Sequence, residues 1–476
     1  MIYCGSFACC KEYAAMREEG DYNRGTEGDT REVIRRYEDM LRSSSTYYFD
    51  VFEFENIIDH YLDLHNAPGA GVAAEIARQQ HPYSSELQLK HAEILIADKK
   101  FEEATALLDL LAQIEPHNPD VMLLLGKLYL AQKWGLKANS YFKKALAENL
   151  ENRTEILGNI CSMFLEKGDT KSALPYLEIA ISEDTDNENL WFDLAYCYDR
   201  EGKTPEAING YIRYLNYDPF NDSAWYNLGL LYSREDEHEK ALDAFEFCVA
   251  IIAEIPIYIL SLAHTLATLE RYPKAIELFK ELLETDPENV NALCSIGECY
   301  EKLGESVLAI SYYDRTILLD PENAEAYYGL AVIHMEKGNY FESLTMVKLC
   351  LKYDDVNPEY WFGLGKVYHK LGSIPESVKA YEKAILLDEE DVDSIAGLAY
   401  IYIEQHDEER ALRNFLRCVE ISEEVEFLVQ AAIIEVRKGM RTQAFEHLQR
   451  AITIDEEAGV DFFNEYPELK NLDDLL

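Results

Sequence analysis

Apolar and polar positions along this chain follow the turn of an α-helix, in pairs of short runs. Trp225 and Tyr232 share one face of a first run, and Ala241 and Phe245 share one face of the run that follows. Between them, residues 234–239 are almost all charged, as is typical of a turn between two helices. The pattern therefore predicts a pair of antiparallel helices.

The same pair recurs along most of the chain. A small residue marks each second helix every 34 residues, apart from one interval of 35 and a last interval of 33. These small residues are Ala70, Ala104, Ala138, Ala173, Ala207, Ala241, Ala275, Ala309, Ser343, Ser377, Ala411 and Ala444. Only stacked copies of one unit require the same close contact so regularly. We therefore predict an all-α solenoid of about twelve helix-turn-helix units.

Other positions of the unit identify a family motif. Residues 225–232 and 361–368 each carry tryptophan followed by Leu-Gly-x-x-Tyr, and residues 191–198 differ only in having Ala195 for the glycine. An aromatic residue follows the small residue by four positions at Phe142, Tyr211, Phe245, Phe279, Tyr313, Tyr381 and Phe415. Prolines close units at Pro82, Pro116, Pro219, Pro287 and Pro321. The chain resembles the tetratricopeptide repeat (TPR) family, as a bacterial-type multi-repeat array.

This resemblance implies a right-handed superhelix whose first helices line a concave groove. The array is expected to span residues 51–457, because no linker rich in proline, glycine or serine interrupts it. Residues 1–29 form a short, polar segment that contains glycines. We expect this segment to be disordered, or to result from a start codon that was assigned too early. Residues 458–476 lose the repeat and are expected to form a closing cap.

An N-terminal capping helix is predicted within residues 30–50. Thr30 is the expected N-cap, because its hydroxyl can accept a hydrogen bond from a free backbone N–H of the first turn. The apolar face of this helix is expected to hold Val33, Ile34, Tyr37 and Leu41. Such a face would cover the open end of the first unit.

Charge narrows the choice of partner. The chain carries 89 acidic and 44 basic residues, for a formal net charge of −45. Nucleic acids and anionic membranes both attract lysine and arginine, so both are disfavoured as partners. Many of the acidic residues fall in turns and on outer helix faces, which favours a surface that is simply solvated. The more specific alternative is that these residues attract a basic protein or peptide. Because no membrane span or signal peptide is evident, a cytoplasmic location is expected.

Motifs for catalysis, cofactors and metals are weak. Residues 69–74 match the dinucleotide fingerprint, but a helix rather than a strand is expected before them, so packing explains them better. Residues 184–188 resemble a calcium loop without its glycine. The ten cysteines form no C-x-x-C pair, and we expect those in the array to be reduced core residues. We therefore predict no enzyme activity, no cofactor and no metal site.

What remains is a surface for another protein. Positions 2, 5, 9 and 12 of each unit share one face of its first helix, which the resemblance places in the groove. The candidate partner-binding residues are Phe192, Tyr196, Asp199, Tyr226, Leu230, Leu260, His264, Tyr328, Phe362, Lys366 and His369. Aromatic residues exposed together are typical of protein-binding faces.

Three functions remain open on these residues. The first is a non-catalytic scaffold or adaptor that holds a peptide or helix of a partner in the groove. The second is a peptide-sensing regulator, and the third is a subunit of a cell-envelope assembly machine. Relatives that clamp the C-terminal carboxylate of chaperones use inward lysines with asparagines, and here Asn159 and Asn227 lack that lysine set. Self-association also remains open.

Overall fold

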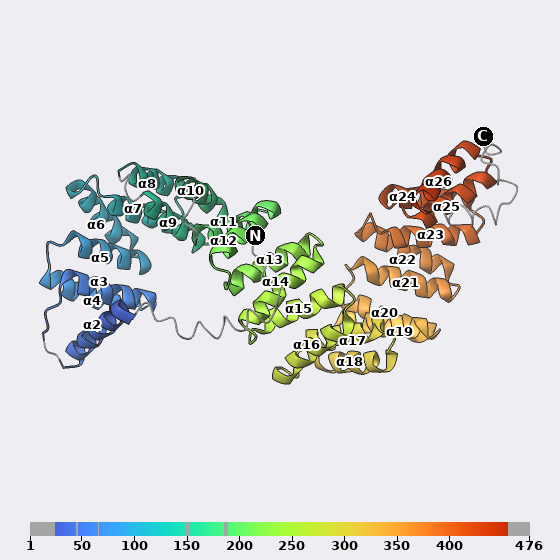
Figure 1. The fold of residues 1–476 in the computed structure, drawn as a ribbon, viewed down its shortest axis with the longest axis horizontal. Coiled ribbons are helices and arrows are strands. Elements are labelled where there is room, and N and C mark those ends of the chain that lie inside the picture. Colours follow the sequence, from blue (N-terminus) through green and yellow to red (C-terminus); the bar gives the residue numbers. More distant parts are fainter. Residues whose placement is uncertain (1–23, 44–45, 65, 149–152, 185–188, 456–476) are drawn as a thin grey trace. The chain divides into compact units, whose positions relative to one another are not determined.

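The computed structural model describes residues 24–43, 46–64, 66–148, 153–184 and 189–455. Helices are the only regular elements in these residues, and there are 25 of them. The chain divides into two compact units, Met1–Tyr258 and Ile259–Leu476, and the division falls within helix α15. Figure 1 shows the helices of each unit following one another in pairs.

The first unit contains α2 and six complete helix pairs. Its helices are α2 (Arg24–Ser43), α3 (Val51–Asp63), α4 (Ala67–Gln80), α5 (Ser85–Ala97), α6 (Phe101–Ile114), α7 (Pro119–Ala131), α8 (Gly135–Glu148), α9 (Arg153–Leu165), α10 (Thr170–Glu183), α11 (Asn189–Arg200), α12 (Thr204–Tyr217), α13 (Asp222–Arg234) and α14 (His238–Ile251). Among the first helices, α3 contacts α5, α5 contacts α7, and α7 contacts α9.

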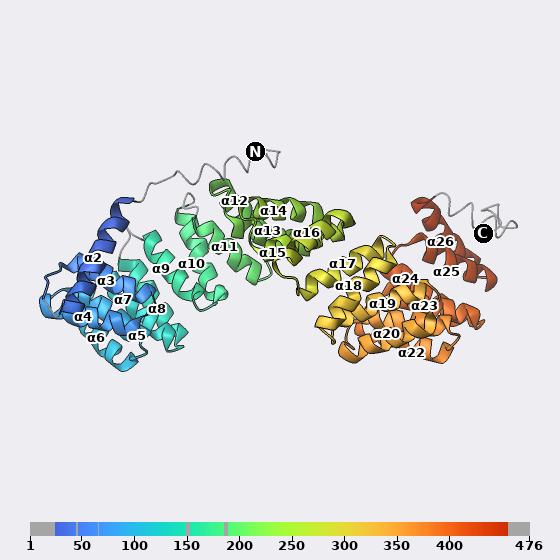
Figure 2. The same cartoon turned by 90° about the horizontal axis from the view of Figure 1, so that it is seen from below.

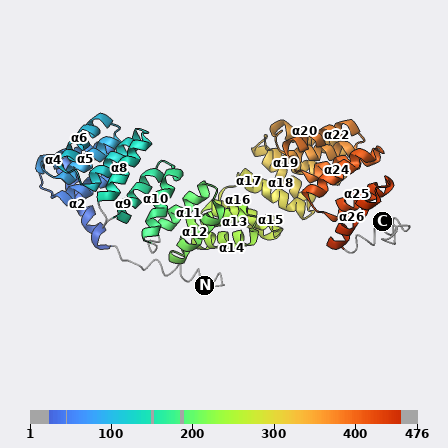
Figure 3. The same cartoon turned by 90° about the horizontal axis from the view of Figure 1, so that it is seen from above.

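The second unit contains five complete pairs after α15. The helices are α15 (Pro256–Thr268), α16 (Tyr272–Thr285), α17 (Val290–Lys302), α18 (Ser306–Leu319), α19 (Ala324–Glu336), α20 (Tyr340–Tyr353), α21 (Pro358–Lys370), α22 (Ile374–Leu387), α23 (Val392–Glu404), α24 (Glu408–Ile421), α25 (Val425–Arg437) and α26 (Arg441–Ile454). First helices α17, α19, α21 and α23 contact one another in sequence. The pair formed by α19 and α20 lies side by side in Figure 2. Figure 3 shows α25 and α26 side by side as the last pair.

The predicted repeat is confirmed by the packing of its small residues. All twelve are buried, with at most 1% of the surface of any one exposed. Where serine replaces alanine, its hydroxyl finds a partner across the pair: Ser343 Oγ donates to the Ala331 carbonyl at 2.8 Å, and Ser377 Oγ to that of Gly365 at 2.7 Å. A small side chain is therefore needed because the two backbones approach closely at this point.

The aromatic residue of the motif fills the space left by glycines. A Cβ atom on Gly297 would lie 2.7 Å from the ring of Tyr313, and one on Gly329 would lie 2.2 Å from the same ring. Tyr313 therefore packs between glycines of its own unit and of the next one. Its ring is fully buried, and its hydroxyl donates to the Glu301 carboxylate at 2.9 Å. This interlocking joins consecutive units into one core.

The turns within pairs share one backbone feature. From the second pair to the last, each turn contains one residue with positive φ, in the left-handed region. Glycine occupies this position at Gly168, Gly202, Gly304, Gly338, Gly372 and Gly439. Other residues occupy it at Lys99, Lys133, Asp236, Glu270 and His406. Because L-residues with a Cβ are strained there, five of these turns keep a local cost that glycine would avoid.

The helix before the array differs from the expected one in two details. Because α2 already begins at Arg24, Thr30 lies inside the helix and is not its N-cap. The expected disorder is therefore wrong for residues 24–29, which are helical. Tyr37 is fully buried, with its ring 6.0 Å from that of Phe49, and Met40 is buried on the same edge. Leu41 lies beyond that edge and is 45% exposed, so its predicted place in the buried face is wrong. The predicted features of residues 1–23 and 458–476 lie outside the described residues.

Candidate functional site

In the first unit, the candidate residues lie on α11 and α13. Phe192 is half-buried, with its ring 5.6 Å from that of Tyr211. The ring of Tyr226 is half-buried too and lies 5.0 Å from that of Tyr258. These two aromatic residues therefore hold neighbouring helices together as well as presenting an edge to solvent. Leu230 is more exposed than these two aromatic residues, with 39% of its surface accessible.

Tyr196 and Asp199 lie nearer to charged side chains. The Arg200 guanidinium carbon is 5.7 Å from the centre of the Tyr196 ring, within reach of a cation–π contact. The Asp199 carboxylate accepts a hydrogen bond from Arg234, which belongs to the first helix of the following pair. Asp199 is thus engaged in an ion pair, which lowers its availability to a partner.

In the second unit, the candidate residues lie on α15, α19 and α21. Tyr328 donates from its hydroxyl to the Glu359 carbonyl at 3.2 Å, and its ring lies against the backbone of Gly363. It therefore packs α19 against α21. Leu260 is half-buried, whereas His264 is exposed with its ring edge-on to Phe279 at 5.1 Å.

Phe362, Lys366 and His369 lie along one side of α21. The Lys366 ammonium is exposed and lies 5.1 Å from the centre of the half-buried Phe362 ring. His369 Nε2 lies 2.9 Å from a carboxylate oxygen of Glu404 on α23. The structure thus brings these three candidates together, and Lys366 is the one most accessible to a partner.

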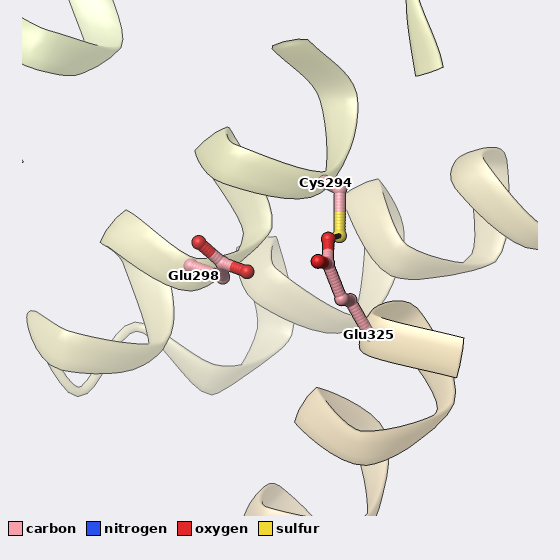
Figure 4. Close-up of side chains that lie close together, drawn as sticks. All are labelled: Cys294, Glu298 and Glu325. Atoms are coloured by element: carbon pink, nitrogen blue, oxygen red, sulfur yellow. Dashed lines mark hydrogen bonds between the residues drawn. The ribbon is translucent and has the colours of Figure 1, made fainter. Parts of the chain in front are cut away.

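The structure also reveals acidic residues on this face that the sequence argument missed. Cys294, Glu298 and Glu301 occupy positions 5, 9 and 12 of the unit that begins at α17. Glu325 and Glu359 follow at position 2 of the next two units. These positions can be read from the repeat in the sequence, but the candidates were chosen mainly for aromatic side chains, and this unit has none at these positions. Figure 4 shows the Cys294 thiol directed at Glu325, with Glu298 beside them.

Cys294, Glu298 and Glu325 lie close together on this face. The Cys294 thiol donates weakly to a carboxylate oxygen of Glu325 at 3.9 Å, and one donor atom from each of Cys294, Glu298 and Glu325 lies within 4.8 Å of the others. Among the described residues, neither lysine nor arginine forms an ion pair with Glu298, Glu301, Glu325 or Glu359. We call these four side chains the acidic face.

Burial and repulsion between carboxylates affect Glu298 most strongly. Burial among the surrounding helices, together with the negative charges of Glu325 and Glu301, raises the pKa of Glu298 from 4.5 to about 7, although the positive charge of Lys302 opposes the change. Burial likewise raises the pKa of Glu301, although the hydrogen bond from Tyr313 opposes the change. Glu298 is exposed at the surface of α17 despite this crowding, so a positively charged group has access to it. Such a group would relieve the repulsion.

The same cluster offers little to a metal ion. Burial raises the pKa of the Cys294 thiol far above its ordinary value, which disfavours the thiolate that metals bind. Within the described part of the chain, only two carboxylates then remain near one another at this point. We therefore interpret it as a charged surface.

Two further sequence arguments are confirmed. Residues 69–74, which match the dinucleotide fingerprint, lie inside α4, where Ala70, Ala73 and Ala74 are buried. The seven cysteines in the described residues are all buried free thiols, and burial raises the pKa of several, including Cys161 and Cys299, to about 12. They are core residues. The loop at residues 185–188 lies outside the described part of the chain.

Comparison with protein families identifies the repeat. Models of the tetratricopeptide repeat match residues 95–134 and 164–246, then 260–320 and 308–344, and finally 358–391. Together these stretches cover just over half of the chain. The chain belongs to the tetratricopeptide repeat family. TPR arrays generally mediate protein–protein interaction and are generally non-catalytic scaffolds.

Three solved structures align with parts or most of the chain. YrrB, described as a TPR protein with an unusual peptide-binding site, is 23% identical, covers 38% of this chain and 96% of its own, and gives a TM-score of 0.32. PilF of Pseudomonas aeruginosa is 15% identical over 44% of this chain and 97% of its own, with a TM-score of 0.40. The APC/C hetero-tetramer Cut9–Hcn1 is 14% identical, covers 96% of this chain and 95% of its own, and gives a TM-score of 0.43. All three TM-scores are below 0.5, so these likenesses assign no property to this chain.

No curated protein matches the chain significantly. Among the described helices, none is long and apolar enough to cross a membrane.

Proposed function

We propose that this TPR protein is a non-catalytic scaffold or adaptor that holds a peptide or helix of another protein. The binding surface is the face of the first helices, which forms the concave groove in a TPR array. A basic segment of the partner binds across α17, α19 and α21. The observation that carries the proposal is the acidic face, whose four carboxylates belong to three consecutive first helices and form no ion pair with a described residue, although Lys302 attracts Glu298 and Glu301.

Physical chemistry supports a cationic ligand at this place. Like charges close together raise one another's pKa and destabilise the ionised state, as at Glu298. A lysine or arginine of a partner would form charge-assisted hydrogen bonds with these carboxylates and offset that repulsion. Half-buried aromatic rings on neighbouring first helices, such as Phe362, would supply apolar contact beside the charges. The whole-chain charge of −45 would speed the approach of such a partner.

The proposal also includes a cytoplasmic location. Its support is the set of seven buried cysteines, all free thiols in the described residues. Free thiols are typical of a reducing compartment, where structural disulfides are rare.

The test is direct binding of a basic peptide. A fluorescein-labelled peptide in which arginines alternate with leucines would be titrated with the full chain, and fluorescence anisotropy would report binding. We expect the Glu298→Gln, Glu325→Gln double variant to bind at least about tenfold more weakly, because each lost charge-assisted contact contributes roughly 1.5–3 kcal/mol. These two side chains are exposed, so their replacement spares the core.

A matched control removes the same charge elsewhere in the same unit. Glu305 and Glu322 are exposed residues of the neighbouring turns. The Glu305→Gln, Glu322→Gln variant should retain binding, because only nonspecific attraction is reduced. Equal loss in both variants would reduce the effect to general charge, and binding unchanged in the first variant would refute a site at the acidic face.

A further inference from the structure

A second surface, away from the first-helix face, stands out at the turn between α7 and α8. Trp134 is the residue directly before α8, and 56% of it is exposed. Ten of the other eleven pairs place a polar or charged residue at the equivalent position, four before the small residue, and the eleventh has Met440. Because the other pairs fold with a polar residue there, packing within the repeat does not require a tryptophan at this position.

Lysines surround this tryptophan. Lys133 and Lys137 flank Trp134 and Leu136, and all four are exposed, with Leu136 at 92%. Two turns beyond Lys137 along α8 lies Lys144, also exposed. None of these lysines forms an ion pair with a described residue, although the Asp109 carboxylate acts on Lys137 from α6. We call Lys133, Trp134, Leu136, Lys137 and Lys144 the α8 patch.

Three stacked rings give the α8 patch a rigid base. The Tyr129 ring lies parallel to that of Trp134, with their centres 5.9 Å apart, and also stacks on Tyr141 at 5.4 Å. The Lys137 ammonium lies 3.9 Å from the centre of the Tyr129 ring, and that of Lys144 lies 4.8 Å from the centre of the Tyr141 ring. Ring contacts thus hold two positive charges in place while leaving them open to solvent.

We propose that the α8 patch docks an acidic segment of a partner protein that carries at least one apolar side chain. Its carboxylates pair with Lys137 and Lys144, and its apolar side chain packs on Trp134 and Leu136. Charge complementarity selects this occupant, because α8 carries three lysines and one glutamate in a chain whose net charge is −45. An anionic membrane is the poorer fit, because the whole chain would be repelled by its surface.

The experiment uses a fluorescein-labelled peptide in which glutamates alternate with leucines, and the full chain. Anisotropy should show binding to the wild type and at least about tenfold weaker binding to the Lys137→Glu, Lys144→Glu variant. Trp134→Ser should weaken binding as well while leaving the charges intact. The control is Lys167→Glu, Lys171→Glu, which makes the same charge change on exposed residues of the following pair and should retain binding. Circular dichroism checks that each variant keeps its helices.

Three outcomes would overturn the proposal: no binding of the peptide to the wild type, equal loss in the Lys167→Glu, Lys171→Glu control, or binding only to phosphatidylserine vesicles. The result is separable from the proposed function of the first-helix face. The Glu298→Gln, Glu325→Gln variant should bind the acidic peptide as well as the wild type does. Conversely, the Lys137→Glu, Lys144→Glu variant should keep its affinity for the basic peptide.

Discussion

At the scale of single residues, the fold depends on where a Cβ atom finds space. Gly329 and Gly158 both lie in first helices, yet their surroundings differ. A Cβ on Gly329 would meet the buried Tyr313 ring, whereas one on Gly158 would meet nothing within 4 Å. The same replacement therefore has opposite consequences at the two positions.

We expect Gly329→Ala to lower the free energy of unfolding by roughly 1–3 kcal/mol, because the Tyr313 ring must shift within a closely packed core. Gly158→Ala, in contrast, should raise it by up to about 1 kcal/mol through helix propensity alone. Urea unfolding followed by circular dichroism measures both. If the two variants moved in the same direction, the contact with Tyr313 would not be the deciding factor.

A second residue-scale effect concerns the charge of Glu298. Its pKa is raised from 4.5 to about 7 in the folded chain, so the folded state favours the protonated carboxyl. The resulting stability is fully present below about pH 4.5 and is lost as the pH rises through 7. Glu298→Gln keeps a neutral side chain at every pH. It should therefore gain stability over the wild type as the pH rises from about 4.5 to about 7, and the difference should stay nearly constant at higher pH.

The measurement is the urea midpoint of both chains across that pH range. Glu305→Gln, in an exposed turn, is the control and should follow the wild type throughout. A constant difference between Glu298→Gln and the wild type would show that the carboxyl titrates normally in the folded chain.

At the scale of elements, the turns within pairs provide an internal comparison. Eleven of them use one left-handed residue, and side chains with a Cβ atom occupy that position in five. Gly304 has open space where its Cβ would lie, so only its backbone conformation, with φ of +76°, opposes a larger residue. Glu270 adopts φ of 59° at the equivalent turn. The two turns therefore isolate the backbone contribution from side-chain packing.

We expect Glu270→Gly to raise stability and Gly304→Ala to lower it, each by about 1 kcal/mol, because a left-handed conformation is costly only for residues with a Cβ. Thermal unfolding of the two variants beside the wild type tests both signs. Loss of stability in Glu270→Gly would mean that the glutamate side chain stabilises its turn by more than the backbone strain costs.

At the scale of the whole molecule, charge is the dominant property. A net charge of −45 opposes the compact state through self-repulsion, and salt screens that repulsion within about 8 Å at physiological ionic strength. Raising sodium chloride from 20 mM to about 500 mM should therefore raise the unfolding temperature. The same salt should weaken binding of the basic peptide at the acidic face. Differential scanning calorimetry and anisotropy measure the two effects, and a fall in unfolding temperature with salt would contradict the first.

The sequence by itself determined the repeat architecture of this protein. The period and the small residues recur in every unit, and the aromatic residue recurs in seven of the twelve, so local pattern and global packing carry the same information. The twelve pairs and the burial of residues such as Ala309 follow directly. The helix before the array has no repeat to guide its prediction. Its start at Thr30 and the burial of Leu41 were therefore predicted wrongly, because one amphipathic pattern permits more than one buried edge.

Only the tertiary structure decided which side chains on the first helices are available. Tyr226 and Tyr328 share the register of exposed residues, but each packs against the first helix of the following pair, which the spacing within one helix does not reveal. The acidic face likewise arises from carboxylates on separate helices, at different positions in the unit. Their proximity depends on how consecutive pairs are offset, and that offset is set by packing between the helices of neighbouring pairs.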